Sequence, residues 1–548
     1  MSSRVEETIR RAYSSKPKYS ELMPGVPEDY LQIKTLGDLL KINYKHATVE
    51  DQLRGNLAAK LRSGENPYPG IIGYEEDVIP AVNRAILSGH DLLLVGQIGQ
   101  AKTKIAESIA KNLLSPIPIV RGTLTNDIPT TIPESQLAAL LTGQEVLRNQ
   151  PEFTVSRECE DIIISDKLEA RIDWLSGEAR YKYILATPDI SVKDLVGQID
   201  AIKIAKRGVE LYSMESYSAG QLLQARHGIL CIDELPVLDP RKQVALLSVL
   251  QEGKFTTGAY PVVFRPDVKI IATANPIDYT HSGKIIEPLF DRLKSHVDTH
   301  YPRTVEDEML IMVQEAKIHS SVFLPEFIVR TIAKVTQAAR RHQSINQDKG
   351  VSVRMAIQAI EVLASESERT RSIVYGVRAV PRFCDVHCIR QSSKFKLTEM
   401  EDTRDNRNSI LQSLIESAEG EVSFEYTRMI NQDQIGKLKA EFAKNKTFQV
   451  AQSMLGTKKD GGSDYDSQLG RFPILKHAVL EAISFTKENQ KRLLEKATSA
   501  GIQSGSILMT ADLDGELTAS VTEVILEGLR QMKPPIVEKK ENNYVPSQ

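Results

Sequence analysis

The stretch Leu92-Leu-Leu-Val-Gly-Gln-Ile-Gly-Gln-Ala-Lys-Thr103 decides the fold of this chain. It begins with an apolar run typical of a buried parallel strand, and a glycine-rich turn follows that run. Residues 105–113 then show the apolar spacing of a helix. A strand, a glycine turn, Lys-Thr and a helix, in this order, predict a phosphate-binding loop in an α/β fold.

The turn offers each group that a bound polyphosphate needs. Gly96 and Gly99 allow a sharp turn, so that backbone N–H groups can point at phosphate oxygens, and the helix N-terminus adds partial positive charge. We expect Lys102 to reach the β- and γ-phosphates and the Thr103 hydroxyl to hold Mg²⁺. The residues expected to bind the nucleotide in this turn are Gly96, Gln97, Ile98, Gly99, Gln100, Ala101, Lys102 and Thr103.

One residue departs from the usual loop pattern. The pattern G-x-x-x-x-G-K-[ST] has glycine before the lysine, whereas this chain has Ala101. Because alanine favours a right-handed backbone, we expect the loop to tolerate Ala101 only where its φ is negative. Taken by itself, the stretch could also be a chance glycine turn between a strand and a helix.

The composition is that of an ordinary globular protein. The chain has 548 residues, a net charge of −3, 41% hydrophobic residues and 26% charged residues. This length favours about three domains. The charge gives no overall attraction to nucleic acid, and no apolar run is long enough to cross a membrane. The first segment lacks the apolar core of a signal peptide. Four cysteines in this length do not make a disulfide framework and favour a reducing compartment, so we expect a cytoplasmic protein; they are Cys159, Cys231, Cys384 and Cys388.

A second motif ends the apolar strand predicted at 228–232, where Asp233 and Glu234 follow. The carboxyl end of such a strand lies at the ligand-binding edge of an open α/β sheet. Unpaired buried carboxylates are costly, so a purely structural role explains this pair poorly. We expect Asp233 to support Mg²⁺, directly or through water, and Glu234 to orient and activate the attacking water.

Three further residues complete the predicted site. Asn275 ends a third apolar strand. If this strand lies beside the one that ends in Asp233, Asn275 would hold the water or the γ-phosphate; taken alone, Asn-Pro would be an ordinary turn. Arg292 could reach a neighbouring subunit's γ-phosphate as an arginine finger, or could simply neighbour Asp291 at the surface. Arg354 begins a predicted helix and would either fold over the nucleotide or face solvent.

The pattern along the chain predicts an αβα core between helical regions. A cluster of helix breakers at 66–70 separates an N-terminal helical arm from this core, and after residue 303 the apolar spacing becomes wholly helical. The expected domains are a helical arm over 1–65, the nucleotide-binding core over 66–303, a helical lid over 304–420 and a helical extension over 421–548.

Several smaller segments also carry expectations. Residues 252–265 are predicted to form a β-hairpin, 457–464 a flexible linker and 533–548 a disordered tail. The segment 71–77 would pack either on an adenine base or into the core. Cys384, His387 and Cys388 share one predicted helix; because a metal site needs three or four ligands and no second pair lies near, a packed helix face is expected there.

Together these motifs resemble the AAA+ ATPases, and in detail the MoxR-like branch and the I subunit of magnesium chelatase. The G-x-x-G-x-A-K-T form of the loop is similar to that of the MoxR-like branch. The likeness covers roughly residues 66–420. The segments similar to the chelatase subunit are 197–200, Lys203, Gly208, 218–223, 226–234, 247–253 and 380–385.

The resemblance implies a three-layer αβα AAA+ domain with a parallel sheet, an all-α lid and extra C-terminal helices. It implies a homo-oligomeric ring, a hexamer or similar, with Mg²⁺ and ATP between subunits. Arg292 would act in trans and Arg354 would be the second sensor. Family members work with a partner that carries a von Willebrand factor A domain. This chain has no Asp-x-Ser-x-Ser run, so that partner would be a separate protein.

Four functions remain open from the sequence. ATP-driven remodelling of a client protein is the leading expectation. The alternatives are the motor subunit of a chelatase that inserts Mg²⁺ or Co²⁺ into a tetrapyrrole, a nucleotide-switched transcription or DNA-associated regulator, and a scaffold that does not hydrolyse ATP. The activator loop Gly-Ala-Phe-Thr-Gly-Ala is absent, which disfavours the regulator, and intact Lys102 and Glu234 disfavour the scaffold.

Overall fold

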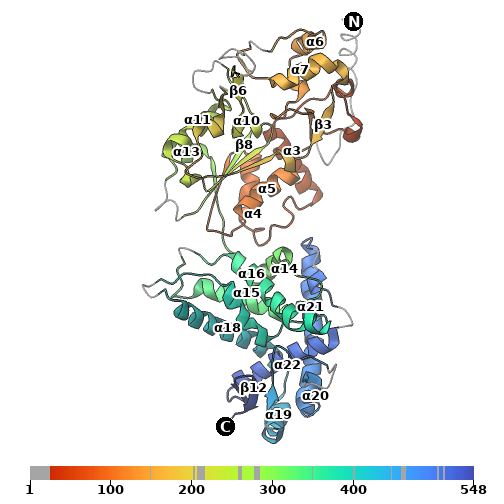
Figure 1. The fold of residues 1–548 in the computed structure, drawn as a ribbon, viewed down its shortest axis with the longest axis vertical. Helices are drawn as coiled ribbons and strands as arrows, with labels where there is room; N and C mark the ends of the chain where they lie inside the picture. Colours follow the sequence, from red (N-terminus) through yellow and green to blue (C-terminus); the bar gives the residue numbers. More distant parts are fainter. Residues whose placement is uncertain are drawn as a thin grey trace. The chain divides into compact units, whose positions relative to one another are not determined.

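The chain forms two compact units in a computed structural model (Figure 1). One unit holds Met1–Gln97 and Ala101–His300, and the other holds Ile98–Gln100 and Tyr301–Gln548. The finer boundaries expected at residues 65 and 420 stay predictions. The structure describes residues 25–147, 150–200, 204–205, 216–256, 262–276, 284–347, 350–398, 402–445, 447–457, 464–502, 505–509 and 513–547.

A five-stranded parallel sheet organises the first unit. Its strand order is β4-β7-β8-β1-β9, and every neighbouring pair is parallel. The apolar runs predicted at 92–95, 228–232 and 268–274 form the three central strands. The strand bounds are β4 Tyr181–Leu185, β7 Ile229–Asp233, β8 Lys269–Ala274, β1 Leu92–Val95 and β9 Ser295–Asp298.

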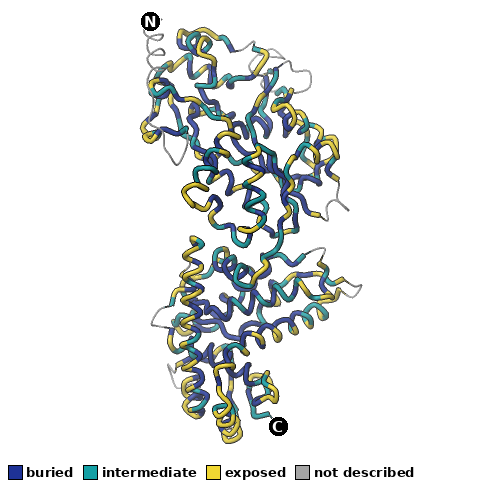
Figure 2. The backbone as a smooth tube through the Cα atoms, turned by 180° about the vertical axis from the view of Figure 1, so that it is seen from behind, coloured by how far each residue is buried: buried dark blue, intermediate teal, exposed yellow. Residues whose placement is uncertain are grey.

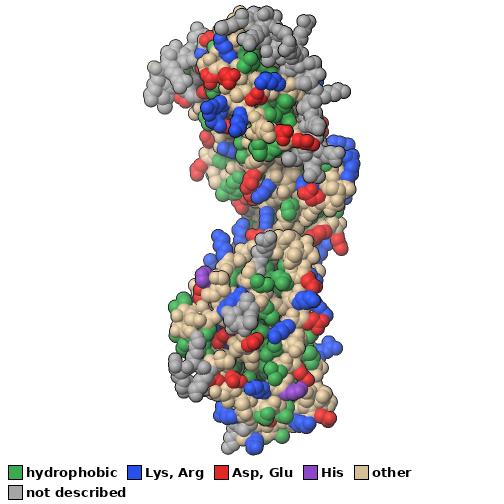
Figure 3. All heavy atoms as spheres, turned by 90° about the vertical axis from the view of Figure 1, so that its right-hand side faces the viewer, with side chains coloured by type: hydrophobic (Ala, Val, Ile, Leu, Met, Phe, Trp, Pro, Cys, Tyr) green, Lys and Arg blue, Asp and Glu red, His purple; other side chains and the backbone are tan. Residues whose placement is uncertain are grey.

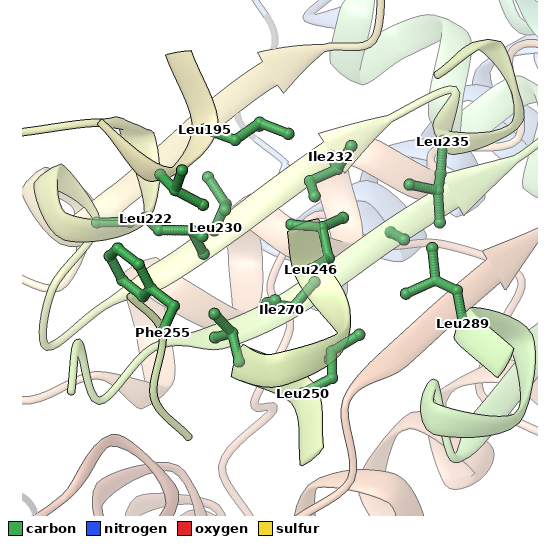
Figure 4. Packing of buried hydrophobic residues seen from close by; sticks show 14 of the residues in the cluster. Leu195, Leu222, Leu230, Ile232, Leu235, Leu246, Leu250, Phe255, Ile270 and Leu289 are labelled. Atoms are coloured by element: carbon green, nitrogen blue, oxygen red, sulfur yellow. The ribbon is translucent and has the colours of Figure 1, made fainter. Parts of the chain in front are cut away.

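Helices cover both faces of this sheet, which explains why its central strands are mostly apolar. Leu93, Ile232 and Ala272 pack in one cluster with residues of α10, α11 and α13 (Figure 4). Leu92 and Ile271 pack in a second cluster with residues of α3, α4 and α5. The predicted three-layer αβα architecture is therefore confirmed. These helices are α3 Val49–Ser63, α4 Val78–Leu87, α5 Lys102–Leu113, α10 Gln221–Gln224, α11 Pro240–Glu252 and α13 Glu287–Arg292.

The segments before and after the phosphate-loop helix add a smaller layer to the first unit. Strand β2 pairs antiparallel with β3 in a separate two-stranded sheet. Ile71 and Tyr74 are buried in the same cluster as α3, so the segment 71–77 enters the core. The remaining elements are α2 Leu36–Lys41, β2 Ile117–Val120, α6 Glu134–Leu141, α7 Arg157–Asp166, β3 Ile172–Leu175, α8 Val192–Val196, β5 Gln198–Ile199 and β6 Tyr217–Ser218.

The second unit is mainly helical, as the sequence predicts after residue 303. Val329, Ile332 and Ala339 of α15 are fully buried at helical spacing. Arg382 pairs with Glu516 at 2.7 Å, which ties the segment before η8 to α22. The helices are α14 Val305–Glu315, α15 Glu326–Arg341, α16 Val353–Ser367, α17 Ile373–Tyr375, η8 Phe383–Gln391, α18 Arg404–Thr427, α19 Gln432–Asn445, α20 Tyr465–Leu469, α21 Pro473–Ser499 and α22 Asp514–Gln531.

The end of the chain folds, so the disorder predicted for 533–548 is wrong. Strands β11 Val537–Lys540 and β12 Asn543–Pro546 pair antiparallel, and β10 Phe448–Gln449 adds a third strand. Val537 and Tyr544 are buried, and the Tyr544 hydroxyl donates to Glu527 Oε2 of α22 at 3.1 Å. Composition failed here because the charged residues stand in the exposed positions around these buried side chains.

Two smaller expectations fall partly on described residues. Phe255 and Phe264 form an antiparallel bridge, as a hairpin over 252–265 requires, although residues 257–261 lie outside the described residues. Residues 458–463 of the predicted linker also lie outside them. Cys384, His387 and Cys388 lie on one helix, η8, as predicted, and both cysteines are partly exposed.

Burial and charge are distributed differently in the interior and on the surface of the described residues. Figure 2 shows the three central strands of the sheet, β1, β7 and β8, as mostly buried. On the face drawn in Figure 3, cationic and anionic side chains are interspersed. Among the described residues, the structure contains no helix of sufficient length and apolar character to cross a bilayer.

Candidate functional site

The predicted site residues from three strands meet at one edge of the sheet. Strand β8 pairs with both β1 and β7 in parallel, so the carboxyl ends of the three strands share that edge. The Gly96 N–H donates to the Ala274 carbonyl at 3.0 Å, which joins the glycine turn directly to the tip of β8. The sheet therefore brings the phosphate-binding loop, Asp233 and the residues after β8 together.

The loop leads directly into helix α5, as its sequence predicts. Lys102 and Thr103 are the first two residues of that helix. The Lys102 ammonium donates to the Gly96 carbonyl at 2.5 Å and to the Gln97 carbonyl at 2.9 Å. The turn thus wraps around the lysine head at the N-terminus of α5, where the helix dipole adds partial positive charge. This is the arrangement that an anion such as a phosphate group needs.

The backbone at Ala101 corrects one expectation. Its φ is +54° and its ψ is 19°, so the negative φ expected from alanine is wrong. Ala101 is the N-cap of α5, and its carbonyl accepts the Ile105 N–H at 2.9 Å. The loop therefore requires a left-handed residue before the lysine, where glycine is easiest, and alanine adopts that conformation at a cost of about 1–2 kcal/mol.

Three hydroxyl groups surround the Asp233 carboxylate at the tip of β7. The Thr103 hydroxyl donates to Asp233 Oδ1 at 3.3 Å, and the Thr273 hydroxyl donates to the same oxygen at 2.5 Å. The Tyr183 hydroxyl donates to Asp233 Oδ2 at 3.0 Å. A carboxylate beside a threonine hydroxyl is the oxygen pair that Mg²⁺ prefers, so Asp233 and Thr103 fit a magnesium site.

Tyr183 stays a neutral donor in this cluster. Partial burial and the neighbouring Asp233 carboxylate raise the pKa of the Tyr183 phenol to about 12. The phenol therefore keeps its proton across the physiological range, and its O–H holds one oxygen of Asp233 in place. The other oxygen remains beside Thr103.

Glu234 and Asn275 follow neighbouring strand ends. Glu234 has a φ of +57°, and its N–H donates to the Thr273 hydroxyl at 3.0 Å. Asn275 follows β8, and only 8% of it is exposed. Because β7 and β8 are adjacent and parallel, both residues lie at the same sheet edge as the loop. Thr273 thus links the two carboxylate residues through one hydroxyl group.

The two predicted arginines lie in different units. Arg292 ends α13, and its guanidinium donates to Gln251 Oε1 at 2.6 Å and to the Pro288 carbonyl at 2.8 Å. Arg354 lies in the first turn of α16 in the second unit, where it is exposed. Neither arginine contacts Asp233 through any bond that the structure gives.

Two site residues, Tyr183 and Thr273, escaped the sequence analysis. Thr273 interrupts an otherwise apolar strand just before Asn275, and this lone hydroxyl was an available signal. Tyr183 lies in β4, within a stretch whose charged and aromatic residues gave no strand pattern. Only the pairing of β4 with β7 places it beside Asp233.

Comparison with known proteins identifies the domain. Residues 163–293 match the family described as AAA domain (dynein-related subfamily). The chain contains an AAA domain. The matched region includes β7, β8 and α13, and with them Asp233, Glu234, Asn275 and Arg292. The match places these residues in an AAA domain and leaves the phosphate-binding loop at 96–103 outside the matched region.

A curated relative and two solved structures are also similar. Uncharacterized protein YeaC of Bacillus subtilis (strain 168) is 24% identical over 206 residues, which are 33% of this chain and 58% of YeaC, so the match spans little more than half of that relative. A structure of the complex between subunits BchI and BchD of magnesium chelatase is 18% identical and covers 59% of this chain and 81% of the other, with a TM-score of 0.30. NtrX from Brucella abortus in complex with ATP is 15% identical and covers 74% and 72%, also with a TM-score of 0.30. TM-scores this low assign no role to any residue of the AAA protein.

Proposed function

We propose that this AAA protein is a Mg-ATP-dependent motor that assembles as a ring and remodels a partner protein. The observation that supports the proposal best is the convergence on Asp233. Its carboxylate lies 3.3 Å from the Thr103 hydroxyl, in the helix that follows the phosphate-binding loop. In this proposal residues 96–103 bind the phosphates of ATP, and Lys102 carries the charge that balances the β- and γ-phosphates.

Magnesium would be held by the Thr103 hydroxyl and by Asp233, directly or through water. When bound, the ion supplies charge that stabilises the phosphate oxygens as the terminal bond breaks. Thr273 and Tyr183 hold Asp233 by its two oxygens, so the carboxylate would not need to reorient when the ion enters.

Glu234 is the proposed general base for the attacking water. The Glu234 N–H donates to the Thr273 hydroxyl, and this hydrogen bond fixes the Glu234 backbone at the tip of the strand. Asn275 would hold the same water or the γ-phosphate by its amide from the next strand tip. The water proton would pass to the Glu234 carboxylate as the oxygen attacks the γ-phosphorus and the bond to the β-phosphate oxygen breaks.

Completion of the site would require a second copy of the chain. Arg292, which Gln251 and the Pro288 carbonyl hold at the end of α13, would act on a neighbour's γ-phosphate in a ring, by preference a hexamer. Arg354 would sense the nucleotide from the helical unit. Hydrolysis would then shift the equilibrium between two arrangements of the units and move a client protein. The expected partner is a cytoplasmic protein that carries a von Willebrand factor A domain.

A chelatase motor is the second candidate. It is supported by the resemblance of residues 218–223, 226–234 and 247–253 to the magnesium chelatase I subunit. In that case the metal inserted into the tetrapyrrole would be cargo handled by other subunits. Co-purification of the chain with an A-domain protein would support a remodelling complex, and co-purification with a tetrapyrrole-binding subunit would favour the chelatase.

The test of the ATPase proposal is the Glu234→Gln variant. The amide keeps the shape of the side chain but cannot accept the water proton, so the hydrolysis rate should fall by about 10²-fold or more while ATP still binds. Glu252→Gln, an exposed carboxylate at the end of α11, is the matched control and should keep the wild-type rate. Equal rates in wild type and Glu234→Gln would remove the assigned role.

A further inference from the structure

A second polar cluster lies at the opposite edge of the sheet from Asp233. His227 comes two residues before β7, and Asp267 comes two residues before β8. The strands are five and six residues long, so about 17–20 Å of backbone separates this cluster from the proposed ATP site. His46, which precedes α3, completes the group. Three segments far apart in the sequence therefore meet at a place that the ATPase mechanism does not use.

The potential ligand atoms have the spacing of a tetrahedral metal site. Asp267 Oδ2 lies 3.1 Å from His227 Nδ1 and 3.4 Å from His46 Nε2. The three ligand atoms lie within 4.8 Å of one another. Bonds of about 2.0–2.1 Å to a tetrahedral zinc ion place two ligand atoms about 3.3–3.4 Å apart. Small rotations of the imidazole rings would therefore suffice to place all three atoms around one ion.

The backbone fixes this spacing before any ion binds. The His227 N–H donates to the Pro266 carbonyl at 3.0 Å, which joins the two loops that carry His227 and Asp267. The Val49 N–H donates to both oxygens of Asp267, at 3.2 and 3.3 Å, and so holds the segment of His46 close to the carboxylate. The two imidazole rings pack edge to face with centroids 4.5 Å apart.

The cluster also contains buried polar atoms without partners. His46 Nδ1 and His227 Nε2 are buried and have no hydrogen-bond partner, and only 5% of the His227 side chain is exposed. These are the ring nitrogens that face away from Asp267, so an ion would bind the other two, His46 Nε2 and His227 Nδ1, which lie beside the carboxylate. Asp267 keeps 28% of its side chain exposed, which leaves a path for an ion and room for a water molecule as fourth ligand.

We infer that His46, His227 and Asp267 form a binding site for a zinc-type transition-metal dication. Two imidazole nitrogens and one carboxylate oxygen suit zinc, whereas magnesium prefers oxygen ligands alone. The bound ion would pin the segment before α3 to the amino-terminal edge of the sheet. Its role is structural, because the site lies far from Asp233 and Lys102.

The experiment uses the full-length protein stripped with a chelator and then dialysed into excess Mg²⁺ without nucleotide, so that the oxygen site near Thr103 is occupied by magnesium. Co²⁺ is titrated as the spectroscopic probe, and Zn²⁺ is then added to compete. Wild type should bind one Co²⁺ per chain with the intense visible absorption of a tetrahedral site, and Zn²⁺ should abolish that absorption.

The variants His46→Gln and His227→Gln should each weaken Co²⁺ binding by at least tenfold. His477→Gln, an exposed histidine on α21, is the matched control and should bind as wild type does. Because a variant could fail to fold, the melting temperature of wild type is also measured with and without Zn²⁺, and it should rise. The inference is overturned if wild type shows no tetrahedral Co²⁺ absorption and no Zn²⁺-dependent rise, or if folded His46→Gln and His227→Gln bind Co²⁺ as wild type does.

Discussion

At the residue scale, the proposed site depends on how one carboxylate is held. Asp233 accepts hydrogen bonds from three hydroxyl groups, on α5, β8 and β4. Thr273 is the central one, because its hydroxyl donates to Asp233 and accepts the Glu234 N–H. The Thr273 hydroxyl would therefore position both the proposed magnesium ligand and the proposed general base without contact with ATP.

The Thr273→Val variant tests this positioning role. Valine keeps the branched shape of the buried side chain and removes only the hydroxyl, so the fold should persist. We expect kcat to fall and the Mg²⁺ concentration for half-maximal activity to rise, each by about 10–100-fold, as for other residues that orient metal ligands. Thr273→Ser keeps the hydroxyl and should recover most of the activity. Wild-type Mg²⁺ dependence in Thr273→Val would contradict the role.

Ala101 allows a second prediction at this scale. Its φ of +54° costs an alanine more than a glycine, and glycine is the residue that the loop pattern usually has there. Ala101→Gly should therefore stabilise the first unit by up to about 1 kcal/mol, because relief of the strain exceeds the extra unfolded-state entropy of glycine.

Thermal and urea unfolding would measure the Ala101 effect. Ala139→Gly is the matched control, since Ala139 lies in the regular helix α6 of the same unit, and this change should destabilise it by about 1 kcal/mol. A loss of stability in Ala101→Gly similar to that in Ala139→Gly would show that the loop does not store this strain.

At the scale of elements, the sequence predicts the centre of the sheet better than its edges. The runs at 92–95, 228–232 and 268–274 are mostly apolar because both faces of each central strand are buried. The edge strand β4 is half exposed and carries Lys182 and Tyr183, so it lacks that pattern. The same reason hides Tyr183 from the predicted site, whereas Asp233 and Asn275 follow obvious strands.

The C-terminal hairpin shows a different limit. Its strands are short and charged, and only tertiary contact with α22 identifies Val537 and Tyr544 as buried. Composition averages over the segment and so misses two buried side chains, Val537 and Tyr544, that stand among exposed charged residues. Contacts between segments distant in the sequence, here Tyr544 with Glu527, cannot be read from either segment alone.

Tyr544 gives the prediction at the scale of elements. Tyr544→Ala should destabilise the second unit by about 3–5 kcal/mol, because it removes a large side chain that is 1% exposed and leaves a cavity under β12. Tyr544→Phe removes only the hydrogen bond to Glu527 and should cost about 1 kcal/mol. Both are measured by thermal unfolding, and a Tyr544→Ala protein as stable as wild type would mean that the hairpin does not pack on α22 in solution.

At the scale of the whole molecule, the proposed mechanism requires more than one chain. One sheet edge of a single chain carries the phosphate loop, Asp233, Glu234 and Asn275. Arg292, at the end of α13, instead donates to Gln251 and to the Pro288 carbonyl. If Arg292 stabilises the transition state in trans, each ATP site consists of one subunit's loop and the next subunit's arginine. An experiment can test whether the loop and the arginine of one ATP site come from different subunits.

Mixing two inactive variants makes this division measurable. Arg292→Ala keeps its own loop but lacks the finger, and Lys102→Ala keeps the finger but lacks a working loop. Each protein alone should hydrolyse ATP very slowly, since an arginine finger contributes about 10³–10⁵-fold to kcat. In rings that assemble randomly from equal amounts, about a quarter of the interfaces would pair an intact loop with an intact Arg292, so activity should return to roughly that fraction of wild type. Subunit exchange is verified by co-purification of differently tagged chains. If mixed rings form and remain inactive, Arg292 does not act across the interface. An arginine that acts within its own subunit would leave every mixed ring without a site that has both an intact loop and an intact Arg292.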